Sequence, residues 1–312
     1  MNHIGEISAL ATAFCWSITS YAFTNVSRRI GALQVNIDRM ALASIFLFII
    51  ISLLGINLTL SFNQVSNLII SGILGLVLGD SFLFKSFQLI GARLGIIIMA
   101  AVPVLSTILA FFFLNEIISF LGMIGMMLTI AGILIVVLER KTSDENNFSI
   151  NKIGIFYGFL GALGQATGLI FAKFAFQGGE LNGFAASFIR LFSASLIILP
   201  LAATFRRYKN PIKVYSKDSY STKVILIGTV FGPVLGITGS LIAIAYAKVG
   251  IASTLMATMP IIMLPISRFY FKEKLDWKAI IGAFVAVIGA AIIFLRSNHI
   301  ALLLYCLIVS SN

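Results

Sequence analysis

Two ionisable residues interrupt the apolar stretch 75–91, GLVLGDSFLFKSFQLIG, which is otherwise hydrophobic enough to lie in a membrane. An acid or a base at bilayer depth is costly, so it usually faces a cavity or a partner. Asp80 and Lys85 are separated by about 140° around a helix, so they do not form a good pair with each other. We therefore expect Asp80 to line an internal cavity as a charge that responds to an ion or a substrate. Lys85 would be a second cavity charge or would extend toward the membrane surface.

Asp80 also allows a structural interpretation. It could be permanently paired with Arg39, Arg190 or Lys85 and only hold helices together, because an ion pair inside a membrane satisfies both charges. The two interpretations make different predictions for an Asp80→Asn variant, since asparagine keeps the shape of the side chain but cannot ionise.

The composition indicates that these charges belong to a membrane protein. Of 312 residues, 59% are hydrophobic and 11% are charged, and the mean hydropathy is +1.05. Soluble domains are about a quarter charged, so a soluble core could not hide this much apolar surface. The net charge of +11 does not predict a nucleic-acid partner, because most basic residues lie in short loops, where they suit an anionic lipid leaflet.

Ten apolar runs are candidates for membrane-spanning helices, each of which needs about 20 residues. They cover residues 4–24, 33–54, 67–89, 94–114, 118–138, 152–175, 183–204, 223–246, 250–271 and 277–295. The runs are continuous rather than alternating with polar residues, which predicts helices and not a barrel. The apolar C-terminal tail, 297–312, is too short to span, and we expect it to be interfacial or packed.

The chain repeats itself. GLVLG at 75–79 matches GPVLG at 232–236, and the same offset, without a gap, pairs Pro103 with Pro260. Glu116 and Glu273, which follow these prolines, and glycines further along also match in register. We expect the two glutamates to be solvated or paired with nearby basic groups. The glycines of the two short motifs form small-xxx-small pairs, which favour close helix packing. The repeated unit is therefore five helices, present twice.

An odd number of helices in each copy means that the two copies enter the membrane from opposite sides. Such inverted repeats are typical of secondary transporters, with a site near the midplane between the halves. We predict an all-α membrane protein with ten transmembrane helices, arranged as two inverted five-helix repeats around a central cavity. The first repeat covers 1–138, the second covers 152–296, and residues 139–151 form the loop between them.

Loop charge predicts the orientation. Lys and Arg favour cytoplasmic loops. The predicted loop 205–223 is rich in both, whereas the equivalent loop of the first half, 55–66, has neither. We therefore expect a multi-pass protein of the plasma (inner) membrane with both termini outside.

A second group of candidates could line the cavity. Trp16, Tyr21 and Gln165 are aromatic or polar positions on the first helices of the halves, and Trp16 and Gln165 are repeat-equivalent. Aromatic walls with a few polar groups hold small ligands, although Trp16 could also pack against the core or lipid. The equivalent residues Met99 and Met256 have flexible thioethers that suit a promiscuous pocket or core packing.

Prolines and arginines complete the set of candidates. Pro103 and Pro260 would lie inside the fourth helix of each half, where proline removes a hydrogen bond and frees a carbonyl. This favours a gating role over a tolerated kink. Arg39 and Arg190 lie near helix starts, where they could anchor the helix or form an internal salt bridge, for example between Arg39 and Asp38 or a neighbouring helix.

With these features the chain resembles the EamA family of the drug/metabolite transporter superfamily, over about residues 1–296. The most specific segments are 100–139 and 257–295, each with a proline in the fourth helix, a glutamate at its end and glycines along the fifth. Many family members have basic residues in the loop between the second and third helices and are thought to have cytoplasmic termini. This chain has no basic residue in that loop.

The resemblance extends to single positions. Arg39 and Arg190 look like the arginines that the family carries in the second helix of each half. Trp16 fits the first-helix tryptophan, and Lys173 fits a lysine often seen at the end of such a helix. The resemblance implies a ten-helix secondary transporter with a central cavity, whose relatives move amino acids, other small metabolites, nucleotide sugars or drugs, many by export.

The predicted function is alternating-access transport, by export, of a small polar or amphipathic metabolite such as an amino acid, coupled to a proton or a counter-substrate. A lipid-carrier flippase or a non-transporting membrane subunit on the same fold are the alternatives. The sequence has no nucleophile–base or metal-ligand motif, so we expect no catalysis, metal or cofactor. A monomer and a homodimer are both compatible with it.

Overall fold

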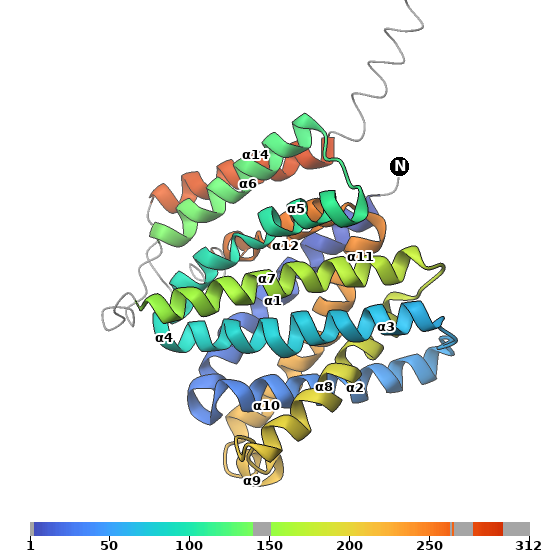
Figure 1. The fold of residues 1–312 in the computed structure, drawn as a ribbon. Helices are drawn as coiled ribbons and strands as arrows, with labels where there is room; N and C mark the ends of the chain where they lie inside the picture. The colour runs from blue at the N-terminus through green and yellow to red at the C-terminus, as the bar shows by residue number, and fades with distance from the viewer. Residues whose placement is uncertain (1–2, 140–150, 263, 265–276, 296–312) are drawn as a thin grey trace, which may run out of the picture.

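The fold is that of a computed structural model, which describes residues 3–139, 151–262, 264 and 277–295. The described residues form helices joined by short connections, and no strand occurs among them (Figure 1). The C-terminal tail predicted at 297–312, Glu273 and most of the loop predicted at 139–151 lie outside these residues.

The first half contains five helical segments. They are α1 (Ile4–Ile30), α2 (Ala32–Leu54), the continuous run of α3 (Phe62–Ser71), η1 (Gly72–Gly79) and α4 (Asp80–Met99), then α5 (Val102–Leu114) and α6 (Phe120–Glu139). The second half begins with α7 (Lys152–Gln177) and α8 (Gly183–Thr204). It continues with the short α9 (Pro211–Tyr215), the run of α10 (Ser219–Thr229), η3 (Val230–Ile237) and α11 (Thr238–Tyr246), then α12 (Val249–Met256) and α14 (Trp277–Leu295).

The third helix of each half contains an eight-residue π-helix, in which backbone hydrogen bonds join residues five apart. In the first half, for example, the Asp80 N–H donates to the Gly75 carbonyl. π-Helical turns are rare and occur frequently at functional sites. Because η1 and η3 lie within one residue of equivalent positions in the repeat, both halves share this backbone feature.

In both halves a helix ends four residues before a proline. A proline ring clashes with the carbonyl four residues before it. Accordingly, α4 ends at Met99, four residues before Pro103, and α12 ends at Met256, four residues before Pro260. The predicted position of these prolines inside a continuous helix is therefore wrong, since each lies just after a break. The predicted break near residues 90–93 is also absent, because α4 continues through them.

Five of the described helices are long and apolar enough to cross a membrane, and α1, α5, α6, α12 and α14 contribute further apolar helical segments. Helices overlap the predicted spans, but ten membrane crossings stay a prediction, because some of these helices are shorter than the length expected. α5, for example, has 13 residues and is about 20 Å long. Large apolar side chains such as Phe112, Phe120 and Phe284 are more than 60% exposed, as a lipid-facing surface requires.

The helix contacts are reciprocal between the halves. α1 packs against η3 and α11, and α7 packs against η1 and α4, so the first helix of each half contacts the third helix of the other. Two further pairs join equivalent helices, namely α2 with α8 and α6 with α14, whereas α5 contacts both α7 and α12. The pair of α6 and α14 forms a separate layer at one edge of the molecule (Figure 1).

Glycines set the spacing of the α6–α14 pair. A Cβ atom at Gly125 would lie 2.8 Å from the Gly289 carbonyl oxygen, and one at Gly282 would lie 2.9 Å from the Gly132 carbonyl oxygen. The two helices therefore run antiparallel with their backbones in close approach, as small residues allow. These glycines thus make a contact between the two halves of one chain.

Candidate functional site

Glycine brings the first helix of the second half against the π-helix of the first half. A Cβ at Gly164 of α7 would lie 2.8 Å from the Gly79 Cα atom, and one at Gly168 would lie 3.0 Å from the Gly75 Cα atom. Only residues without a side chain permit this approach. It places Gln165 directly beside η1, where its amide nitrogen donates to the Gly75 carbonyl at 3.0 Å.

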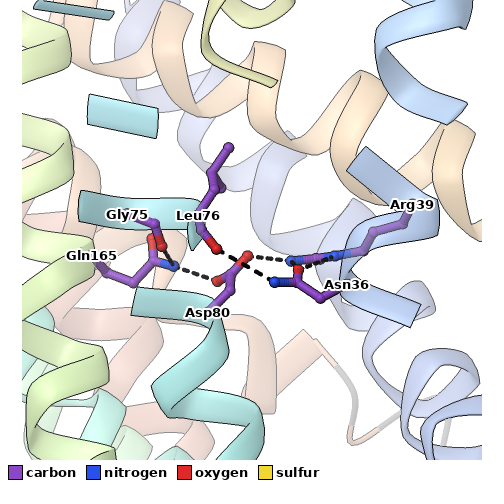
Figure 2. A network of polar contacts seen from close by, with 6 residues as sticks. All are labelled: Asn36, Arg39, Gly75, Leu76, Asp80 and Gln165. Carbon is purple, nitrogen blue, oxygen red and sulfur yellow. Dashed lines mark hydrogen bonds and ion pairs between the residues drawn. The ribbon is translucent and has the colours of Figure 1, made fainter. Parts of the chain in front are cut away.

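The Asp80 carboxylate lies at the centre of a buried polar network (Figure 2). One oxygen, Oδ2, forms an ion pair with the Arg39 guanidinium of α2. The other oxygen, Oδ1, accepts a hydrogen bond from the Gln165 amide of α7. A single carboxylate therefore binds one group from each half of the chain. Of the two suggested partners for Arg39, Asp38 or a neighbouring helix, the structure shows a neighbouring helix.

Asn36 holds the Arg39 side chain in place. Its Oδ1 atom accepts from Arg39 Nε at 3.0 Å and from Arg39 Nη2 at 2.9 Å. Its amide nitrogen faces the Leu76 carbonyl of η1 at 3.4 Å (Figure 2). Asn36 is fully buried and was not identified from the sequence. The signal available was its position one helical turn before Arg39.

A second arginine lies near the same carboxylate. Arg190 of α8 is only 2% exposed, and its guanidinium interacts electrostatically with Asp80. A Cβ at Gly75 would lie 2.6 Å from Arg190 Nη2, so the glycine leaves room for the guanidinium against η1. The structure thus brings together four of the predicted residues, Asp80, Arg39, Gln165 and Arg190.

The other predicted residues lie elsewhere. Lys85 is exposed on α4, and no described contact joins it to Asp80. Trp16 is partly buried, with its indole edge against Gly236 of η3, and Met256 is 4% exposed at the end of α12. Met99 is partly buried at the end of α4. Tyr21 belongs to α1, but its side chain lies outside the described residues.

The two prolines lie beside the contact between the fourth helices. Pro103 and Pro260 are both buried. The Pro103 carbonyl, in the first turn of α5, accepts from the Ser106 hydroxyl at 3.1 Å. Ser106 in turn shares a 2.7 Å hydrogen bond with Ser253 of α12, so the two halves are joined directly next to the Pro103 break.

Lys173 belongs to a second cluster, at the end of α7. Its ammonium group lies 3.8 Å from the Glu116 carboxylate and donates to carbonyls at the end of α11, including that of Ala247 at 3.2 Å. Glu116 also accepts from the Val249 N–H at 2.7 Å. Burial raises the pKa of Glu116, and the Val249 N–H and Lys173 partly offset this effect. The cluster closes the break between α11 and α12, and of the two alternatives predicted for Glu116, solvation or pairing with a basic group, the structure shows pairing.

A third cluster, centred on Asp38, was not identified from the sequence. The hydroxyls of Tyr208 and Tyr215 each donate to this buried carboxylate at 2.7 Å, and Gln34 donates at 2.9 Å. Burial and the nearby carboxylate raise the pKa of both tyrosines, so they remain protonated donors. These contacts attach the basic loop between α8 and α10 to the start of α2. Tyrosines within a polar loop gave no indication of a buried partner.

Comparisons with known proteins agree with this architecture. A family model described as the EamA-like transporter family matches residues 3–138 and 152–295. A 94-residue stretch is 32% identical to a WAT1-related chloroplastic protein of Arabidopsis thaliana, and the match spans 30% of this chain and 22% of that protein. A crystal structure described only as that of a protein is 14% identical and has a TM-score of 0.75, over 94% of this chain and 96% of that one. The last likeness shows a shared fold. Because the family match covers nearly the whole chain, this multi-pass membrane protein belongs to the EamA-like transporter family.

Proposed function

We propose that the chain is a secondary transporter whose halves, residues 1–138 and 152–296, form an inverted repeat and move against each other around Asp80. The observation that carries this proposal is the Asp80 carboxylate, which binds Arg39 of one half and Gln165 of the other. Any movement that separates α7 from η1 must break the second of these contacts.

The repeat itself is supported by three features. The π-helices and the breaks before the prolines recur at equivalent places, and the contacts between halves are reciprocal. α1 also runs antiparallel to the run of α10 and η3, since its Trp16 contacts Gly236 and its Phe23 contacts Gly228. α7 has the same relation to η1 and α4. Reciprocal, antiparallel packing of this kind is what two inverted copies require.

Proton coupling follows from the chemistry of the carboxylate. An ionised Asp80 attracts Arg39 and accepts from Gln165, whereas a protonated one loses the charge that holds the ion pair. Protonation therefore weakens the contact between the halves, and separation of the halves exposes the carboxyl to water and to protons. A proton carried in this way supplies the driving force for movement of a small metabolite, an amino acid among the first candidates. Pro103 and Pro260, beside the contact of α5 with α12, would supply the bend.

The test is transport by purified protein in proteoliposomes, with pools of amino acids and other metabolites, with and without a pH gradient. Asp80→Asn should still fold and exchange substrate but should lose accumulation driven by the gradient. Asp38→Asn is the matched control, because Asp38 is equally buried but binds tyrosines at the start of α2. This control should keep gradient-driven accumulation. Normal gradient-driven transport by a well-folded Asp80→Asn protein would falsify the assignment.

A further inference from the structure

The arginines of the two second helices occupy equivalent places but have unequal partners. Arg39 and Arg190 lie on the second helix of their halves, and each follows a polar residue, Asn36 or Ser187, by three positions. Residues three apart on a helix lie on the same face, one turn from each other. In α2 the pair is complete, because Asn36 Oδ1 accepts from Arg39 Nε at 3.0 Å.

The equivalent pair in α8 is incomplete. Ser187 is fully buried and Arg190 is 2% exposed, yet neither Ser187 Oγ nor Arg190 Nε has a hydrogen-bond partner among the described residues. A buried N–H of a guanidinium without an acceptor is strongly unfavourable, so such groups are normally satisfied. In α2, the Asn36 oxygen accepts from the Arg39 guanidinium. Among the described residues, no equivalent oxygen accepts from the Ser187 hydroxyl and the Arg190 Nε–H of α8.

The charges around Arg190 indicate what kind of group would accept from these two donors. Within the described part of the network, two guanidinium groups, those of Arg39 and Arg190, face a single carboxylate, that of Asp80. The contact of Arg39 with Asp80 is direct, so Arg190 retains uncompensated positive charge. Uncompensated buried charge is strongly unfavourable, and an anion relieves it. A guanidinium binds a carboxylate in preference to other acceptors of similar size because its planar donors match the two oxygens.

We propose that Arg190 and Ser187 bind the carboxylate of the transported substrate. One carboxylate oxygen would accept from Arg190 Nε–H and from Ser187 Oγ–H, in the place that Asn36 Oδ1 occupies in the first half. Gly75 permits this arrangement, because any side chain there would displace the guanidinium. The site lies against η1 and close to Asp80, so substrate and proton act on the same pair of arginines. This inference rests on the proposed transport function and specifies its substrate class.

The first experiment measures thermal unfolding of the purified protein in detergent. The probes are the common amino acids and the corresponding 2-oxo acids, each compared with its amide. At least one acid should raise the Tm of the wild-type protein, and its amide should not. Ser187→Ala should weaken the affinity for that acid about tenfold, the effect of one hydrogen bond to a charged group. Ser195→Ala, on the same helix, should leave it unchanged, because the Ser195 hydroxyl donates to the Phe192 carbonyl.

A second variant tests the two unpaired donors themselves. Ser187→Asn introduces the acceptor that Asn36 supplies in α2, so it should raise the Tm of the ligand-free protein and abolish the stabilisation by acids. The proposal is overturned if Ser187→Asn lowers that Tm, if no acid stabilises the protein, or if amides stabilise it equally. The proposal also fails if Ser187→Ala binds the acid with unchanged affinity, because only water would then lie between Ser187 and Arg190.

Transport assays separate this proposal from the one on which it rests. If an acid and its amide were transported at equal rates, both driven by a pH gradient, the proposed carboxylate site would be refuted, but the proposed transport function would stand. If acids raised the Tm but no substrate were transported, the carboxylate site would be supported and the proposed transport function would be refuted.

Discussion

The third helices of the two halves have nearly the same backbone and different chemistry. Both contain an eight-residue π-helix with glycines within it. In the first half this π-helix leads into Asp80, which binds Arg39 and Gln165, whereas the equivalent residue of the second half is Ile237, 6% exposed in an apolar cluster. The shared backbone therefore supplies the frame, and the charge is a property of one half alone.

The neighbours of the two π-helices differ in the same sense. Gln165 packs against Gly79, and its repeat equivalent Trp16 packs against Gly236. An amide donor thus accompanies the acid in one half, and a large ring fills the equivalent space in the other. The two halves thus share a symmetric backbone, but only one of the two equivalent positions carries a charge. An ion therefore has one defined site in this scaffold rather than two.

The largest expected effect comes from removing the partner of Asp80. Arg39→Leu leaves a buried carboxylate without its ion pair, which should lower the free energy of unfolding by about 3–5 kcal/mol. Arg190→Leu should lower it by much less, because Asp80 keeps both Arg39 and Gln165. Denaturant unfolding in detergent measures both losses. Equal losses would contradict the asymmetry, whereas recovery in the Arg39→Leu/Asp80→Leu double variant would strengthen it.

A smaller effect is expected from closing the space between backbones. Gly164→Ala puts a Cβ 2.8 Å from both the Gly79 Cα atom and the Leu74 carbonyl oxygen, so two helix backbones must move apart. We expect a loss of about 1–3 kcal/mol. Gly236→Ala meets mainly the Trp16 ring, which can rotate, so its loss should be smaller. Thermal unfolding of the two variants side by side measures the difference, and a greater loss in Gly236→Ala would contradict it.

The smallest effect concerns a break that only the second half contains. Its helix is interrupted between α11 and α12, where Glu116 and Lys173 bind the free backbone groups, while α4 of the first half continues through the equivalent residues. Because the pKa of Glu116 is raised on folding, the folded protein binds its proton more tightly than the unfolded one. Its contribution to stability is therefore greatest below the ordinary glutamate pKa and declines as the pH rises through the raised value.

Glu116→Gln should remove this part of the pH dependence. The Tm of the wild-type protein, measured in detergent from acid to neutral pH, should fall relative to that of the variant as the pH increases. Glu180→Gln is a suitable control, because Glu180 is exposed in the loop between α7 and α8. A constant difference in Tm between the wild-type protein and Glu116→Gln across this range would show that the carboxyl does not titrate with folding.

Much of the framework was predictable from the sequence, because it depends on local rules. Ten apolar runs and an ungapped repeat predicted the helices, and Asp80 was noticeable because a carboxyl within an apolar run needs a partner. The end of α4 was misplaced because the short polar interruption at 91–93 was given more weight than Pro103. The steric effect of a proline reaches back four residues, and helices in membranes tolerate polar interruptions when neighbouring helices satisfy them.

The partners of the charges were not predictable in the same way. Whether Asp80 binds Arg39, Arg190 or Lys85 depends on how α2, α7 and α8 rotate about their axes, which is decided by glycine contacts distant in the sequence. Asn36 and Ser187 looked like ordinary polar residues until their arginines could be compared. The two tyrosines that donate to Asp38 lie in the loop between α8 and α10. The path of this loop back to the start of α2 cannot be predicted from a local sequence pattern.

The order in which the residues of the Asp80 network are synthesised has a consequence for biogenesis. Asn36, Arg39, Leu76 and Asp80 all belong to the first three helical segments, so the ion pair can form before the second half leaves the ribosome. An aspartate or arginine at the centre of an isolated inserted helix costs about 2.5–3.5 kcal/mol. Insertion of these segments as a group brings the two charges together and lowers that cost. Arg190 enters later and meets a carboxylate that is already in place, so the nascent first half acts as a template on which the second half assembles.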